Sequence, residues 1–318
     1  MQPHQQFERY IVVSNPKSTN AQNAARRIAE LRALAPPAEV IVVETSAEGR
    51  LANMRLLRQF ADKLGERTLL CIAAGDGTIN SIIEGLLSDP ELPETARQTP
   101  VLPLWCGNAN DLAHMLNGRA YKAKLSTLVT TGKLVKIFPI CCTLTDKNGK
   151  VERRLAACYV SFGASAYTTK VLAKAIRQPT LFHRWPMGRF LQELGIVIGA
   201  MRQAPPFAAT EDGQQKTIFE YIFFNGPRFA KVEGVKRRLA DKSFHRVAVG
   251  RKRLSSIAAS LFTLTRRDSS ALEATHAAFT TLEPTWAQFD GESADIPEGT
   301  LVEITVADKP FIALATRL

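Results

Sequence analysis

The sequence predicts two parts: a parallel α/β domain over residues 1–136, followed by a mainly antiparallel β domain over residues 137–318. The first half alternates apolar strand-like runs with amphipathic helical segments, which is typical of a parallel sheet covered by helices on both faces. The second half instead has short β-like segments separated by polar and turn residues, which favours antiparallel pairing. A chain of 318 residues is long enough for two such domains.

The elements of the first half follow one another in a regular order. Apolar periodicity predicts the helices at Ala21–Leu34, at Leu51–Leu64, from Ile79 to Leu87 and from about Asn110. The buried strands between them are predicted at Tyr10–Ser14, Glu39–Glu44, Thr68–Ala73 and Val101–Leu104.

The second half contains strands and one long helical interruption. The strands are predicted at Leu155–Phe162, Ile218–Asn225, Phe244–Val249 and Leu301–Val306. The interruption runs from about Thr168 to Arg202, and its apolar part is expected to pack on the β domain or to form a hydrophobic lid. The last strand, Phe311–Ala315, could belong to either domain.

Composition indicates a globular protein of the cytoplasm. No apolar run approaches the ~20 residues that span a bilayer, and the first ten residues lack the pattern of a secretory signal. The five cysteines form no CxxC pair, so we expect packing residues in a reducing compartment.

Positive charge is concentrated in one segment of the second half. Between Gly226 and Arg267 there are twelve Lys/Arg and two acids, which accounts for +10 of the net charge of +11. Solvated loops would explain this pattern, and so would peripheral contact with an anionic membrane surface, where each Lys/Arg contributes about 1 kcal/mol. No nucleic-acid-binding signature accompanies the charge, so nucleic acid is not an expected partner.

Three polar loops follow strands of the predicted parallel sheet: Asn15–Thr19, Gly75–Thr78 and Gly107–Asp111. Each alone could be a tight turn with a helix cap. Together they lie at the carboxyl edge of the strands, where α/β sheets bind ligands, and helix-start amides there favour phosphate. Neither GxxxxGK[ST] nor GxGxxG is present, so the loops are not a standard nucleotide motif.

Four short motifs occur in a specific order: NPxS at Asn15, GDGT at Gly75, GxxND-hydrophobic-Ala at Gly107, and DGE at Asp290. In this they resemble the diacylglycerol kinase catalytic domain family, most closely its soluble bacterial lipid-kinase branch, which is related to sphingosine, ceramide and NAD kinases. The resemblance implies a Rossmann-like α/β domain followed by an antiparallel β-sandwich domain.

The resemblance also implies roles for individual residues. Asp290 matches the proposed general base that would accept a proton from a lipid hydroxyl, and Glu292 is the alternative. A carboxylate beside ATP phosphates is repelled unless a cation lies between them or unless it binds sugar hydroxyls. Asp76 is therefore expected to help hold Mg²⁺, with Asp111 as an outer partner. The residues expected to line the ATP cleft are Asn15, Ser18, Thr19, Thr45, Gly75, Asp76, Gly77, Thr78, Gly107, Asn108 and Asn110.

Four positions depart from the family pattern: Ala74, Asn108, Phe138 and Lys242. Three functions therefore remain open: an ATP- and Mg²⁺-dependent kinase of diacylglycerol or a similar lipid, a decayed relative that only binds lipid or nucleotide, and a kinase of a soluble hydroxyl substrate such as NAD. The sequence also leaves the oligomeric state open, a homodimer included.

Overall fold

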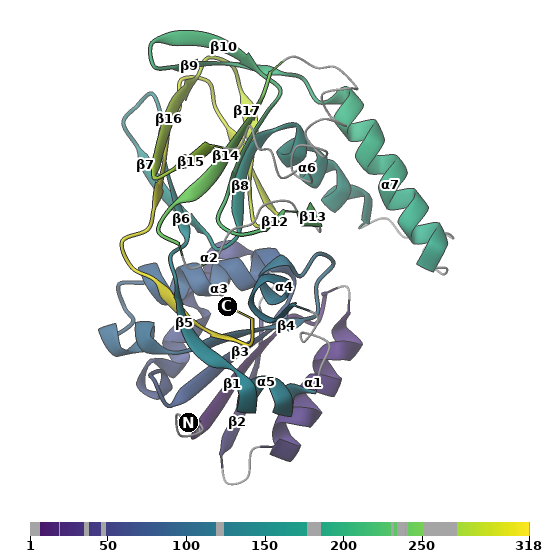
Figure 1. Cartoon of the computed structure of the whole chain (residues 1–318), viewed down its shortest axis with the longest axis vertical. Coiled ribbons are helices and arrows are strands. Elements are labelled where there is room, and N and C mark those ends of the chain that lie inside the picture. Colours follow the sequence, from purple (N-terminus) through teal and green to yellow (C-terminus); the bar gives the residue numbers. More distant parts are fainter. Residues whose placement is uncertain are drawn as a thin grey trace.

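The computed structural model describes residues 7–18, 20–34, 38–45, 49–118, 124–176, 186–229, 232–233, 239, 241–250 and 272–317. These residues form one helix-flanked sheet and, above it in Figure 1, a second body built on two antiparallel sheets. The fold class expected from the sequence is confirmed.

The first sheet has six strands in the order β2-β1-β3-β4-β20-β5. Strands β1 (Arg9–Ser14), β2 (Glu39–Glu44), β3 (Thr68–Ala74) and β4 (Val101–Trp105) are parallel. The sheet is completed by β20 (Phe311–Ala315), parallel to β4, and by β5 (Lys133–Ile137), antiparallel to β20. The last strand therefore returns to the first sheet, between two strands that precede the whole second domain.

Helices cover both faces of this sheet. One face packs on α1 (Ala21–Leu34) and α5 (Leu125–Thr131). The other packs on α3 (Asp76–Ser88), α4 (Asp111–Asn117) and the helical stretch of α2 (Arg50–Arg55) with the 3₁₀ segment Leu56–Lys63. A shorter 3₁₀ segment, Glu94–Gln98, precedes β4.

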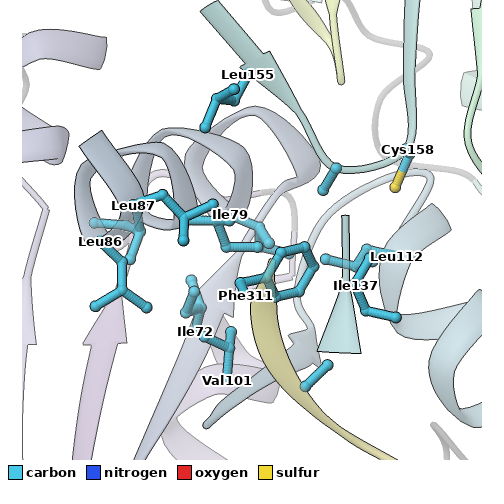
Figure 2. Close-up of a cluster of buried hydrophobic side chains, with 14 of the residues drawn as sticks. Ile72, Ile79, Leu86, Leu87, Val101, Leu112, Ile137, Leu155, Cys158 and Phe311 are labelled. Carbon is cyan, nitrogen blue, oxygen red and sulfur yellow. The ribbon is translucent and has the colours of Figure 1, made fainter. Parts of the chain in front are cut away.

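The core between α3 and the sheet extends into the second domain. Phe311 lies in its centre, with Ile79 of α3 and Leu112 of α4 around it and Leu155 and Cys158 at its upper edge (Figure 2). All five are almost fully buried. Because one apolar cluster includes residues of both domains, it fixes the helices of the first domain against the strands of the second.

The second domain contains two six-stranded sheets, with the orders β10-β9-β16-β19-β6-β7 and β15-β14-β11-β8-β17-β18. Every strand pair recorded in them is antiparallel. Their aromatic and aliphatic side chains share one core. The strands are β6 (Ile140–Thr145), β7 (Val151–Ala156), β8 (Tyr159–Gly163), β9 (Phe207–Glu211), β10 (Gln214–Ile218), β11 (Glu220–Phe224), β14 (Phe244–Val249), β15 (Leu272–Ala274), β16 (His276–Thr281), β17 (Thr285–Phe289), β18 (Glu292–Ile296) and β19 (Leu301–Val306), beside a short pair, β12 (Arg228–Phe229) and β13 (Val232–Glu233).

The single strand expected at Leu155–Phe162 is wrong. The chain instead leaves one sheet at Ala156 and enters the other at Tyr159, so Ala157 and Cys158 form a corner between β7 and β8. A continuous buried apolar run cannot reveal such a corner, because both strands and the corner itself are buried.

The expected long helical interruption consists, in its described part, of α6 (Ala164–Ile176) and α7 (Pro186–Gln203), which pack on each other at the side of the second domain (Figure 1). Residues 177–185 of this interruption, which include the first part of the possible lid expected at Leu181–Met201, lie outside the described residues. None of the described helices has the length and apolar character needed to cross a membrane. All five cysteines are buried and free.

Candidate functional site

The three predicted loops meet at one edge of the first sheet. The side-chain amide of Asn15 donates to the hydroxyl of Thr78 at 3.3 Å, which joins the first loop to the second. Asn20, which follows the first loop, donates its side-chain amide to the Gly107 carbonyl at 3.1 Å, which joins the first loop to the third. The expectation that parallel strands bring these loops together is therefore met.

The second and third loops approach each other through glycine. A Cβ added to Gly107 would lie 2.6 Å from the Gly75 Cα, so only glycine fits at position 107. Asn110 has a left-handed backbone, and its side chain closes the third loop by accepting from the Gly107 amide and donating to the Gly107 carbonyl, both at 2.8 Å. The third loop is thus rigid and pressed against the second.

Asp76 links these loops through its carboxylate. One oxygen accepts from the Asn110 amide and the other from the Asp111 amide, each at 2.8 Å. The carboxylate thereby lies at the start of α4, where helix-end amides favour negative charge. Burial, and then the nearby charge of Asp111, raise the pKa of Asp76 to about 7.

The start of α3 lacks a side-chain cap. Its N-cap residue is Gly75, and neither Asp76 nor Thr78 caps the helix. The first-turn amides of this 13-residue helix are therefore oriented as they would be for an anionic ligand. The buried hydroxyl of Ser18 has no hydrogen-bond partner within the described residues, which fits a polar ligand beside the first loop.

The DGE motif reaches these loops from the second domain. Asp290 and Gly291 form a two-residue hairpin turn between β17 and β18, and both have positive φ. This turn packs on the start of α3, where a Cβ added to Gly77 would lie 2.7 Å from the Glu292 Cγ. Asp290 of this turn is buried beside the first domain, whereas Gly291 is exposed.

Asp290 is fixed at the corner between β7 and β8. Its carboxylate accepts from the backbone amides of Cys158, at 3.1 Å, and Tyr159, at 2.8 Å. The residue is 1% exposed. Burial first, and the charge of Asp76 among the other causes, raise the pKa of Asp290 to about 8. Asp76 and Asp290 are thus close enough to influence each other's ionisation, although they come from different domains.

Comparison with known protein families gives a match over the first domain. Residues 9–139 match the family described as the diacylglycerol kinase catalytic domain. A search of curated proteins found no match to the chain.

Solved structures share the fold of the whole chain. A protein of Bacillus anthracis strain Sterne assigned as a diacylglycerol kinase is 18% identical, with a TM-score of 0.68 over 97% of each chain. A diacylglycerol kinase of the same strain is 16% identical, with a TM-score of 0.62 over 97% of each chain. Yeast NADH kinase, solved with NADH, is 12% identical, with a TM-score of 0.52 over 98% of this chain and 84% of its own.

Asp111 has a contact that the sequence does not reveal. Its Oδ1 accepts from the Nε of Arg228 at 2.6 Å, and both residues are buried. Arg228 comes from β12 of the second domain, so the ion pair joins the two domains. An engaged, buried carboxylate of this kind does not suit direct contact with a hydrated Mg²⁺.

Asp76 is better suited than Asp111 to contact a hydrated Mg²⁺. Mg²⁺ in phosphate-transferring sites is usually held by one or two carboxylates together with substrate phosphates and waters. Asp76 is half-buried, and each of its oxygens uses one lone pair for an amide, which leaves acceptor capacity on both. The described residues hold no group of three or more His, Cys, Asp or Glu side chains that could bind a metal by themselves.

The remaining predicted residues differ in position. Thr45 follows the edge strand β2 and donates its backbone amide to the Ser14 carbonyl at 2.9 Å, beside the first loop. Asn108 is exposed at the tip of the third loop. Thr19 lies outside the described residues. Ala74, which stands where the family has a glycine, is the last residue of β3. Its φ is not positive, so the alanine side chain causes no backbone strain there.

Several residues that shape the site were not predicted. Asn80 and Glu84, on the buried side of α3, bind the backbone at the end of β7. The spacing of four residues between them, inside an otherwise apolar helix, was a usable signal because buried polar groups need partners. Arg50, Arg154 and Arg228 gave no such signal, since their partners are distant in the sequence.

Proposed function

We propose that the chain is an ATP- and Mg²⁺-dependent kinase that transfers the γ-phosphoryl group to a hydroxyl of diacylglycerol or a similar lipid. The observation that carries this proposal is the contact of the Asp290–Glu292 turn with Gly77. It brings a carboxyl pair from one domain to the phosphate-type helix start of the other. Phosphoryl transfer needs this combination of a phosphate cradle and an acceptor-side carboxyl.

Each part of the site has a role in the proposal. The amides at the start of α3 and the loop around Gly107 would hold the phosphates, with Asp76 binding Mg²⁺ through one oxygen or a water. The metal would offset charge on the transferring group. Asp290 would accept the proton of the attacking hydroxyl, for which a pKa of about 8 suits a base working near neutral pH. Glu292 is less buried than Asp290 and is the alternative base.

Replacing each carboxyl tests this assignment. We expect Asp290→Asn to lower turnover of lipid, measured with labelled ATP, Mg²⁺ and mixed micelles, by about a hundredfold or more. ATP binding should persist, because Asp290 lies on the acceptor side. A larger loss in Glu292→Gln than in Asp290→Asn would assign the base to Glu292. Transfer of label to NAD or NADH, with no label in the lipids, would reject the lipid acceptor. Nucleotide binding without any turnover would indicate a decayed kinase.

The outer side of α7 supports contact with a membrane. Leu194 and Ile198, one helical turn apart, are 42% and 43% exposed. Arg202 is exposed one turn further on, and Lys174 is exposed on the neighbouring α6. Apolar side chains flanked by cations match the boundary between lipid chains and anionic headgroups.

Vesicle binding tests this part of the proposal. We expect the protein to sediment with vesicles containing phosphatidylserine, less so with pure phosphatidylcholine, and less as salt rises from 50 to about 150 mM, because exposed charge is screened. Leu194→Ser with Ile198→Ser should weaken binding several-fold. Leu282→Ser, at an exposed leucine between β16 and β17, is the matched control. Equal binding to both vesicle types at every salt concentration would reject the proposal.

A further inference from the structure

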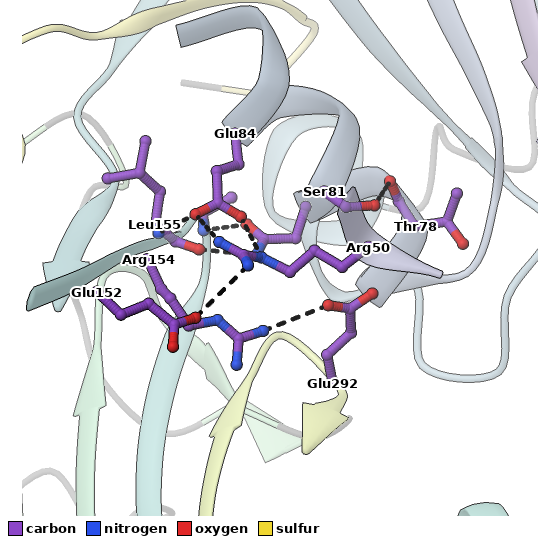
Figure 3. A network of polar contacts seen from close by, with 10 residues as sticks. Arg50, Thr78, Ser81, Glu84, Glu152, Arg154, Leu155 and Glu292 are labelled. Atoms are coloured by element: carbon purple, nitrogen blue, oxygen red, sulfur yellow. Dashed lines mark hydrogen bonds and ion pairs between the residues drawn. The ribbon is translucent and has the colours of Figure 1, made fainter. Parts of the chain in front are cut away.

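Charged side chains from both domains meet beside the DGE turn. The group comprises Arg50 of α2, Glu84 of α3, Glu152 and Arg154 of β7, and Glu292 at the start of β18 (Figure 3). Three carboxyls and two guanidinium groups therefore lie in one region of the interface. The two arginines have very different partners.

Arg50 is bound mainly by Glu84 of the first domain. Its Nε and one terminal nitrogen each donate to Glu84 at 2.7 Å, which is a bidentate pair. Glu84 also accepts the Leu155 amide at 3.0 Å, so this pair ties α3 to the end of β7. The third Arg50 nitrogen is 3.6 Å from Glu152.

Arg154 has a looser set of contacts. Its side chain is 7% exposed, and its guanidinium carbon lies 4.0 Å from the centroid of the Phe289 ring. One terminal nitrogen is 3.4 Å from a Glu292 oxygen, and its Nε has no hydrogen-bond partner within the described residues. A buried cation with so few partners contributes little to stability, because its desolvation cost exceeds what one long ion pair returns.

Glu292 is held at both ends. Its Cγ occupies the space that a side chain at position 77 would need, and its carboxylate faces Arg154. The Glu292 side chain therefore packs against Gly77, which leaves room for it by having no Cβ, and its carboxylate lies beside the Arg154 guanidinium.

We propose that Arg154 is a positioning residue that directs the Glu292 carboxylate, in its charged form, toward the start of α3, where the acceptor hydroxyl would meet the phosphates. This inference rests on the proposed kinase function and deepens it. Arg154 itself touches neither substrate. It acts through Glu292, which makes Arg154 part of the acceptor side of the site although it lies on a strand outside every predicted motif.

The charges around Glu292 indicate how Arg154 would act. Burial raises the pKa of Glu292 to about 7, Arg154 and then Arg50 oppose that rise, and Glu84 adds to it. Glu152 stands next to Arg154 on the same side of β7, and Asp290 lies two residues before Glu292. Removing the Arg154 charge should therefore raise the pKa of Glu292 further.

The first test is the pH dependence of lipid phosphorylation. Transfer in this proposal needs a charged Glu292 beside the base Asp290. In Arg154→Met, whose side chain can still pack on Phe289, kcat/KM below the pKa of Glu292 should therefore fall about tenfold for each unit by which that pKa rises. Arg154→Lys should restore kcat/KM at least in part, because it returns the charge. Arg153→Met is the matched control, since Arg153 is exposed on the opposite side of the same strand.

The second test does not depend on kinase activity. Carbon-13 NMR of glutamate-labelled protein, with Glu292→Gln to assign the resonance, follows the ionisation of Glu292 directly. We expect a higher midpoint in Arg154→Met, or in Arg154→Gln if the methionine variant does not fold, and a midpoint near wild type in Arg153→Met. An unchanged Glu292 midpoint and an unchanged acidic limb of kcat/KM would overturn the inference. A shifted NMR midpoint in a chain without kinase activity would support the contact and reject the proposed function instead.

Discussion

Gly77 illustrates how one residue sets the distance between the domains. Its α carbon faces Glu292, and the gap contains no room for a side chain. Asp290 makes the matching adjustment on the other side, since it adopts a left-handed backbone in order to place its carboxylate under the Cys158 and Tyr159 amides. The GDGT and DGE motifs are therefore parts of a single contact.

Adding one methyl group at this contact should disable the site. In Gly77→Ala the new Cβ would lie 2.7 Å from the Glu292 Cγ, so the Glu292 side chain must move. We expect kcat/KM for the lipid to fall about tenfold or more, because small displacements of reacting groups are costly. Gly250→Ala, at a glycine with open space around it, should leave kcat/KM unchanged. Full activity in Gly77→Ala would show that the position of Glu292 is not critical.

Two of the departures from the family pattern contact each other. The Lys242 ammonium lies 4.5 Å from the centroid of the Phe138 ring, a cation–π contact of about 0.5–1 kcal/mol at an exposed site. Phe138 also supplies its carbonyl to the side chain of Asn225 at 2.7 Å. Lys242 thus places a positive charge of the chain itself beside Phe138.

At the scale of elements, α3 is the part that connects the three polar loops to the second domain. Its apolar side packs on the first sheet, while Asn80 reaches the corner between β7 and β8. The same corner supplies the amides that bind Asp290. The sequence predicted this helix, and it predicted the three loops because strand ends carry local signals. It could not predict the corner, which depends on partners far apart in the chain.

Removing the Asn80 side-chain amide should loosen this connection. Asn80 donates to the Leu155 carbonyl at 2.7 Å and accepts from the Ala157 amide at 3.1 Å. In Asn80→Leu both buried backbone groups lose their partner, at about 1–3 kcal/mol each. We expect urea denaturation to show a loss of free energy of unfolding of about 2–4 kcal/mol. A loss below about 0.5 kcal/mol would mean that the backbone groups find other partners.

For the whole molecule, the notable electrostatic property is a set of buried carboxyl groups with raised pKa. Burial is the largest cause for Glu220, which caps the start of α6 through Ser165, as it is for Asp290, Asp76 and Glu292. Each binds a proton more tightly in the native state than in the unfolded chain. Between about pH 5 and pH 8 the native protein therefore holds more protons, and its free energy of unfolding falls as the pH rises.

Glu220 allows this pH dependence to be measured away from the site. Its pKa is raised to about 8, so its contribution is complete below pH 4.5 and is lost as the pH rises toward 8. We expect Glu220→Gln to reduce the drop in free energy of unfolding between pH 5.5 and pH 8.5, by about 1.4 kcal/mol for each pKa unit removed. Equal drops in the variant and the wild type, compared by urea denaturation, would contradict the burial argument.

The return of β20 to the first sheet has a consequence for how this protein can be divided. A fragment that ended at Ile137 would hold β4 and β5 without the strand that pairs with both, and without Phe311 to fill the space beside α3. During synthesis, all other strands of the first sheet leave the ribosome before β20 is made. The first domain should therefore become protease-resistant only after some 170 further residues have emerged.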